Sequence, residues 1–219
     1  MNPNRALRIV SFIVSSITFF EVLVAADNEN LEDVCPTAAS TALFINGYPC
    51  KSYANTSASD FKSSKLSTPG DMDNFHRSAV TLATAADFPG LNTLGLSVAR
   101  FDIEVDGLVV PHSHPRSAEM MYVSKGVVIA GFIDTETNLF QKRMREGEVM
   151  VFPRGLLHFC LNDGFEAATV FSVLNSQNPG WVSIASALFP SQPNVDDADV
   201  VNKLRTRLIA SSMGSHLRG

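Results

Sequence analysis

Short runs of hydrophobic residues, separated by polar turn residues, follow one another from Leu94 to Leu174 of the 219-residue chain. Runs of this length, bounded by turn residues, are typical of β-strands. The segments that we expect to be strands are Leu96–Val105, Met120–Val123, Val127–Ile133, Leu139–Arg143, Glu148–Phe152, Leu157–Leu161 and Ala167–Leu174. Many short strands at close spacing predict an all-β fold, either an antiparallel barrel or a jelly roll.

The two flanks of this central part have different patterns. Residues 27–65 are polar with few apolar runs, which favours an N-terminal arm packed outside a barrel formed by residues 66–190. After Pro193 the spacing becomes helical, and we expect a C-terminal helical extension over residues 191–219. Its start has acidic residues that suit a helix N-terminus, followed by apolar residues on one face: Asp196, Asp197 and Asp199, then Val200, Val201, Leu204 and Leu208.

The first 26 residues have the three parts of a secretory signal peptide. Arg5 and Arg8 are positively charged, an apolar run covers Ile9–Phe20, and Ala25 and Ala26 are small residues suited to cleavage. The alternative is a membrane anchor, but the run is shorter than the roughly 18 to 20 residues that span a bilayer. We therefore expect residues 1–26 to be removed and the protein to be secreted.

The charge of the chain changes little with this cleavage. The full chain has 17 basic and 22 acidic residues, and the mature chain keeps 15 and 21, a net charge of −6. Nothing in this balance indicates a nucleic-acid partner, and no other segment is long and apolar enough to cross a membrane. The remaining 193 residues suit one domain with an adequate core.

Three of the five histidines lie in two segments that indicate a metal site. In a strand, His112 and His114 project from the same face with Cα atoms about 6.5 Å apart, so both imidazoles can reach one ion. Glu119 follows a proline-containing turn and would add an oxygen ligand, while His158 would complete the set from another strand. For the histidine pair alone, a polar strand face or a buried core histidine remains the alternative.

The second segment strengthens the prediction of a metal site. Gly147 precedes an apolar run that Pro153 ends, and Gly155 permits a turn with positive φ. We expect this turn to form a hairpin that places His158 on the outgoing strand.

These segments resemble the two motif boxes of the cupin superfamily. The first box, G-x5-H-x-H-x3-4-E-x6-G, is matched except that Asp106 replaces its first glycine. The second, G-x5-P-x-G-x2-H-x3-N, is matched in full and ends at Asn162. More narrowly, the chain resembles the plant germin-like proteins in four further segments: Asn46–Lys51, Leu91–Gly95, Pro111–Arg116 and Asn175–Gly180.

The germin resemblance implies manganese held by His112, His114, Glu119 and His158, and a homo-oligomer, usually a hexamer built as a trimer of dimers. In oxalate-oxidising germins two asparagines hold the substrate, and the shared segments place Ala99 and Val109 at those positions. Neither side chain can donate a hydrogen bond, so oxalate oxidation is not expected.

The favoured function is manganese-dependent superoxide dismutation in the apoplast, with a role in defence. The alternative is an extracellular-matrix binding, receptor or structural protein with a structural metal.

Several single residues carry more limited expectations. A disulfide between Cys35 and Cys50 would persist in an oxidising compartment and is implied by the resemblance, whereas two separate buried thiols are the alternative. Asn55 begins an N-glycosylation sequon. Cys160 is expected to face the interior as a small buried residue, with an additional ligand or redox role as the alternative. Arg116 could be either a partner of the site or a surface charge.

Overall fold

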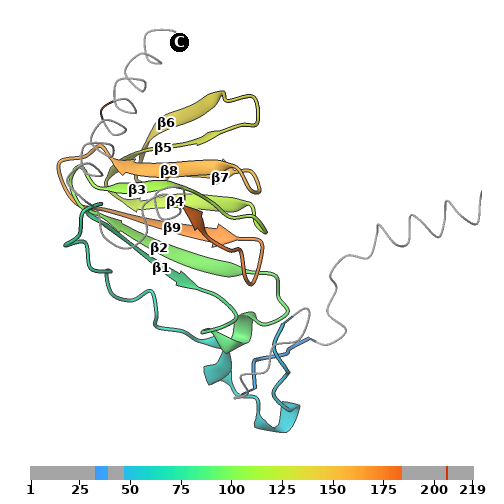
Figure 1. Cartoon of the computed structure of the whole chain (residues 1–219). Helices are drawn as coiled ribbons and strands as arrows, with labels where there is room; N and C mark the ends of the chain where they lie inside the picture. Colours follow the sequence, from blue (N-terminus) through green and yellow to red (C-terminus); the bar gives the residue numbers. More distant parts are fainter. Residues whose placement is uncertain (1–32, 39–46, 184–205, 207–219) are drawn as a thin grey trace, which may run out of the picture. The chain divides into compact units, whose positions relative to one another are not determined.

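The computed structural model describes residues 33–38, 47–183 and 206 (Figure 1). The chain divides into two compact units, Met1–Asp33 and Val34–Gly219, and the second contains all the elements described below. Its strands are β1 Ser78–Ala83, β2 Ser97–Ile103, β3 Leu108–Ser113, β4 Glu119–Lys125, β5 Val127–Ile133, β6 Leu139–Arg145, β7 Val149–Phe152, β8 Leu157–Asn162, β9 Ala168–Leu174 and β10 Val182–Ser183. Three short 3-10 helices accompany them: η1 Tyr53–Asn55, η2 Ala58–Phe61 and η3 Pro89–Leu91.

The strands form two five-stranded sheets, with strand orders β1-β2-β9-β4-β7 and β10-β3-β8-β5-β6 (Figure 1). All neighbouring strands are antiparallel. Strands that follow one another in sequence repeatedly fall in different sheets, so the connections cross between two layers as in a jelly roll. This confirms the predicted all-β jelly-roll fold, in which the described ladders form two separate sheets and not one closed ring.

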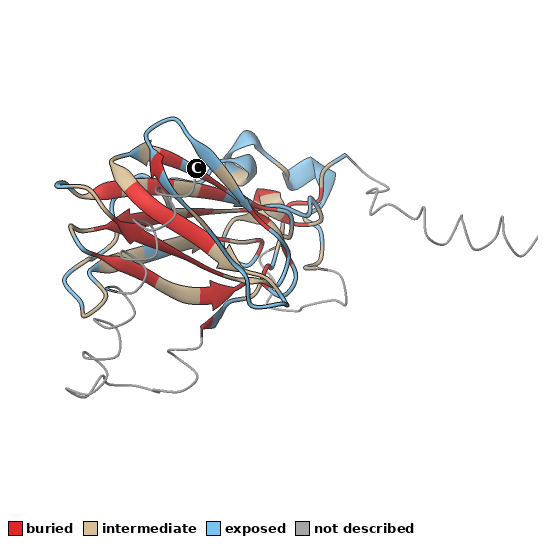
Figure 2. Ribbon diagram, turned by 90° about the horizontal axis from the view of Figure 1, so that it is seen from above, coloured by how far each residue is buried: buried red, intermediate tan, exposed pale blue. Residues whose placement is uncertain are grey.

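Buried positions alternate with less buried ones along β4 and β9, whereas β5 and β8 are buried over most of their length; Figure 2 shows the burial of each residue by colour. In β4, for example, Glu119, Met121 and Val123 are buried, whereas Met120 and Tyr122 are exposed. This alternation follows from the period of two in a strand, which places every second side chain between the sheets. The shared core combines residues of both sheets, including Phe101, Val109, Met121, Val128, Cys160 and Val170.

The structure corrects two details of the sequence prediction. The expected hairpin before His158 is wrong, because β7 pairs with β4 in one sheet while β8 pairs with β3 and β5 in the other. Gly155 does adopt the expected positive φ, of 73°, but its turn carries the chain from one sheet to the other. Turn residues alone do not distinguish these two cases. Strands β1, β3 and β10 were not among the segments expected to be strands, although the argument for a metal site placed His112 in a strand. β1 and β10 contain no uninterrupted strongly apolar run, and Pro111 interrupts β3.

The disulfide between Cys35 and Cys50 is present. Nearby, the buried side chain of Asn92 donates hydrogen bonds to the carbonyls of Cys35 and Tyr48 and accepts one from the Tyr48 amide. The bridge closes a loop with a sequence separation of 15, which in the chain-entropy model contributes about 3 kcal/mol. The disulfide and the Asn92 amide therefore both fix this segment.

The remaining expectations for the two ends concern residues that the structure hardly describes. The signal peptide lies outside the described residues, and so does the C-terminal helical extension apart from Thr206, which is helical. The boundaries of the arm and the barrel stay predictions. Among the described residues, no helix has the length and apolarity needed to cross a membrane.

Candidate metal centre

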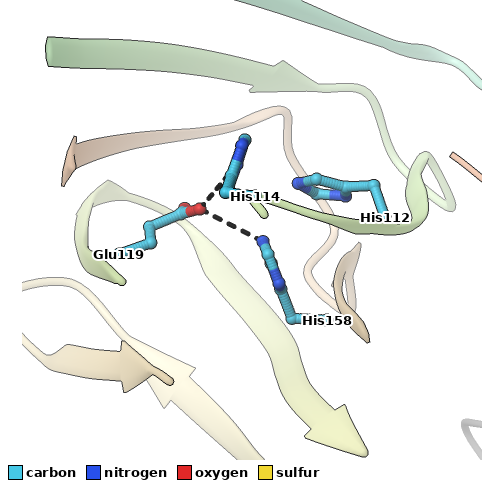
Figure 3. A group of neighbouring side chains, drawn as sticks. All are labelled: His112, His114, Glu119 and His158. Atoms are coloured by element: carbon cyan, nitrogen blue, oxygen red, sulfur yellow. Dashed lines mark hydrogen bonds and ion pairs between the residues drawn. The ribbon is translucent and has the colours of Figure 1, made fainter. Parts of the chain in front are cut away.

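Four side chains, three from strands and one from the residue that follows β3, converge in the interior, as Figure 3 shows. His112 lies in β3, Glu119 begins β4, His158 lies in β8, and His114 follows one residue after the end of β3. Each is at most 3% exposed, and one potential ligand atom from each lies within 4.8 Å of the others. The structure thus brings together all four residues that the sequence indicated.

Backbone carbonyls set the orientation of all three imidazoles. The Nδ1 atoms of His112, His114 and His158 lie 2.8, 2.5 and 2.9 Å from the carbonyl oxygens of Val110, Gly180 and Leu156. A carbonyl oxygen can only accept, so each Nδ1 carries the proton and donates it. In a neutral imidazole the Nε2 atom then has a free lone pair, and these lone pairs are the ones that can bind a metal ion.

The Nε2 atoms of His112 and His114 require a partner that the described protein atoms do not supply, whereas His158 Nε2 lies within hydrogen-bond distance, 3.1 Å, of Glu119 Oε2. Neither His112 Nε2 nor His114 Nε2 has a hydrogen-bond partner, although both are buried. His114 Nε2 and His158 Nε2 lie 3.0 and 3.1 Å from Glu119 Oε2, and the first contact lacks the alignment of a hydrogen bond. Buried lone pairs directed at a carboxylate are unfavourable unless a proton or a cation lies between them. The donor set therefore fits a divalent cation.

The charges of the site agree with this conclusion. Burial would raise the pKa of Glu119, but contacts in which a proton lies between its carboxylate and the Nε2 atoms of His114 and His158 outweigh burial in the metal-free site and hold the pKa of that carboxyl below its usual range. Burial, together with the neighbouring His158, lowers the pKa of His112 to about 3. At neutral pH the centre thus has an ionised carboxylate and an uncharged His112, which are the forms that bind metals.

An apolar cavity borders these ligands. Besides His112, Glu119 and His158, it is lined by Phe101, Val109, Met121, Phe152, Phe159 and Cys160. The Cys160 thiol is buried, and burial raises its pKa, so it is the small buried residue that we expected and is not a reactive thiolate. The cavity wall offers no amide or hydroxyl group to a bound anion.

Two residues of the motif boxes have structural roles. The Asn162 amide nitrogen lies 2.9, 3.1 and 2.8 Å from the carbonyl oxygens of Ile103, Glu104 and Glu166, which ties β8 to two neighbouring turns. Asp106, which replaces a glycine of the first box, has a φ of 58°. Aspartate tolerates this left-handed conformation better than most residues, so the turn between β2 and β3 survives the replacement.

Other candidate residues lie outside the cluster of ligands. Arg116 is exposed and donates hydrogen bonds to the Asn178 carbonyl and side chain, which supports the interpretation as a surface charge. Asn55 is exposed in η1, and its glycosylation stays a prediction.

Sequence reasoning missed the aromatic rings that contact the imidazoles. Phe152 stacks on His158, with ring centroids 4.7 Å apart, and Trp181 stacks on His112, with centroids 3.8 Å apart. Trp181 is the only tryptophan of the chain and directly follows the motif that ends at Gly180. Its position next to that motif is the one signal that could have drawn attention to it.

A jelly roll that directs three histidines and one glutamate into its interior defines a cupin with a candidate metal site. The cupin family model accordingly matches residues 64–206. The chain is 51% identical to germin-like protein subfamily 3 member 4 of Arabidopsis thaliana, over 93% of this chain and 94% of that protein. It is 52% identical to germin-like protein 11-1 of Oryza sativa subsp. japonica, over 85% of this chain and 83% of that protein.

A solved structure of oxalate oxidase has a similar fold, with a TM-score of 0.72 and 34% sequence identity over 86% of this chain and 99% of that one. The chain belongs to the germin-like proteins of the cupin family.

Proposed function

We propose that this chain is a secreted, manganese-binding germin-like protein with superoxide dismutase activity. The observation that carries the proposal is the combination of a buried ligand set, His112, His114, Glu119 and His158, with an apolar cavity beside it. Three nitrogens and one carboxylate leave two positions of an octahedral ion open for a small ligand. When bound, manganese supplies one-electron redox chemistry.

The protein holds the ligands in place, keeps their Nδ1 protons and sets the charge of the centre. The carbonyls of Val110, Gly180 and Leu156 hold the Nδ1 protons of the three imidazoles, so these protons are not free to move to a substrate. The two protons consumed in forming hydrogen peroxide from superoxide therefore come from water. The single carboxylate keeps the net charge of the centre positive with a divalent ion, which favours the approach of a small anion.

Oxalate is a poor fit to this centre. A buried dianion needs donors that compensate for its lost hydration. Ala99 and Val109 lie in the same buried core, and neither can donate a hydrogen bond. The similarity to oxalate oxidase thus supports the fold, while these two residues argue against the same substrate.

The remaining parts of the proposal concern the setting of the protein. Cleavage after Ala26 would deliver it to the apoplast, where the disulfide of Cys35 and Cys50 would persist and Asn55 could be glycosylated. The family relationship supports a homo-oligomer, a hexamer by resemblance, and a role in defence.

The decisive experiment uses the glycoprotein purified from the medium of a plant expression host. Elemental analysis, a superoxide-decay assay and an oxalate-oxidation assay are performed on the same sample. We expect one manganese per chain, accelerated superoxide decay and no carbon dioxide from oxalate. His158→Ala should lose both metal and activity, whereas His76→Ala, which replaces a histidine outside the cluster, should keep both.

Three results would contradict the proposal. Copper or zinc in place of manganese would contradict the proposed manganese-dependent redox activity. Manganese without superoxide activity would favour the binding or structural alternative, in which the ion stabilises the fold. Equal activity of His158→Ala and the wild type would separate the activity from this site.

A further inference from the structure

Two adjacent residues beyond the motif boxes contact two different candidate ligands. The Gly180 carbonyl accepts the Nδ1–H of His114 at 2.5 Å, and the Trp181 ring stacks on His112 with an interplanar angle of 13°. Trp181 also meets the His114 ring edge-on, with centroids 5.5 Å apart. This short segment therefore fixes half of the ligand set.

The backbone around Trp181 is held in place independently of any ion. β10 pairs with β3, which places Ser183 opposite His112 and Val182 opposite Ser113. The Arg116 amide donates to the Pro179 carbonyl, and the Arg116 side chain binds Asn178. The indole is thus presented to His112 by an anchored segment.

A comparison with His158 shows what the stacking does. His112 and His158 each donate Nδ1–H to the carbonyl two residues earlier, and each has an aromatic ring nearly parallel to the imidazole. The hydrogen bond fixes one edge of the ring, and the aromatic neighbour covers one face. Phe152, the partner of His158, is buried, whereas Trp181 is 39% exposed, so the Trp181 ring lies at the boundary with solvent while His112 is only 2% exposed.

We propose that Trp181 is a positioning residue of the metal centre. Its indole holds the His112 imidazole in the orientation that directs Nε2 to the ion, and it shields that imidazole face from water. The bound ion is thereby released more slowly. This role rests on the metal site proposed above and gives that site a determinant outside the four ligands.

The test measures release of Mn²⁺ from the purified, manganese-loaded full-length glycoprotein into an excess of EDTA. Trp181→Val removes the flat ring but keeps a β-branched residue suited to a strand edge, and we expect release roughly 10- to 100-fold faster, the usual effect of losing a supporting contact. Trp181→Phe keeps a stacking ring and should release the ion at a rate close to that of the wild type. Phe165→Ala, which removes a 99% exposed aromatic ring away from the centre, is the control and should match the wild type.

A second readout needs no substitution. Because the chain has one tryptophan, its fluorescence reports on Trp181 alone, and Mn²⁺ bound at His112 should quench it in proportion to occupancy. Wild-type release rates in Trp181→Val, or fluorescence unaffected by stoichiometric Mn²⁺ uptake, would overturn the role of Trp181 and leave the metal site standing. Wild-type protein that takes up no Mn²⁺ would overturn both. The fluorescence result stands even if Trp181→Val does not fold.

Discussion

His112 and His158 are direct partners across the β3–β8 ladder, and their ring centroids lie 4.2 Å apart. The register of this ladder shifts between Val109 and His112, so a bulge precedes the pair. In a strand, a shift of one residue would turn either histidine to the opposite face. The candidate centre therefore depends on strand register as much as on the identity of its side chains.

Glu119→Gln tests the charge of the ligand set. The amide is nearly the same size as the carboxylate but removes the negative charge that faces His114 and His158. We expect manganese affinity to fall by more than the roughly 10- to 100-fold typical of a lost supporting contact, while the fold is kept. Elemental analysis and circular dichroism measure the two effects, and Glu136→Gln, at an exposed turn, is the control. Unchanged manganese content would show that Glu119 is not a ligand.

Acid should destabilise the metal-free protein through His112. Its pKa falls from 6.5 in the unfolded chain to about 3 in the fold, so between these values the unfolded state binds more protons. The contribution of His112 to the free energy of unfolding is complete above about pH 6.5 and is lost as the pH falls towards 3. This contribution is on the order of a few kcal/mol in total. Urea unfolding in the presence of a chelator, repeated across this range, measures it.

The variant His112→Gln separates this contribution from that of Glu119. The pKa of Glu119 is lowered from 4.5, so its contribution is lost only below about pH 4.5. In this variant, the free energy of unfolding should therefore no longer vary with pH above about 4.5 through residue 112. Below about pH 4.5 it should still fall, because Glu119 is unchanged. A variant as sensitive as the wild type between pH 5 and 6.5 would contradict the assignment to His112.

Much of the candidate metal centre could be predicted because the features that indicate its ligands are short motifs in the sequence. To predict that the two histidines share a face, only the two-residue period of a strand is needed. To predict the turn at Gly155, only the tolerance of glycine for a positive φ, which is 73° here, is needed. The spacing of the two motif boxes then brought Glu119 and His158 into the same set. No long-range pairing had to be known for these predictions.

The parts that the sequence did not reveal depend on pairing between distant segments. Whether β7 and β8 form a hairpin or belong to different sheets depends on their partners β4 and β3, which a turn motif does not specify. Trp181 contacts His112 only because two-residue β10 joins the edge of β3. Such a short strand has too few residues to show a period.

Introducing the missing amides tests why oxalate is excluded. In Ala99→Asn/Val109→Asn, two amides would stand in the buried core, the one at position 109 at the wall of the cavity beside the candidate centre, and we expect oxalate to perturb the Mn²⁺ electron paramagnetic resonance signal of this variant but not that of the wild type. Leaving these polar groups buried without partners should cost about 1 to 3 kcal/mol each, so unfolding is measured in parallel. Ala99→Val/Val109→Leu, which adds no hydrogen-bond donor, is the control for altered packing. Oxalate oxidation by the wild-type protein would refute the argument.

Asn162→Ala should reduce stability without removing the ion. The change leaves the buried carbonyls around the amide, including that of Ile103, without their donor and takes the acceptor from the Gly164 amide. At about 1 kcal/mol for each hydrogen bond, the free energy of unfolding should fall by roughly 2 to 4 kcal/mol, whereas Asn138→Ala at an exposed turn should cost less than about 1 kcal/mol. Because Asn162 contacts backbone and none of the four candidate ligands, the folded variant should keep its manganese. Loss of manganese at full native circular dichroism would instead make Asn162 part of the metal centre.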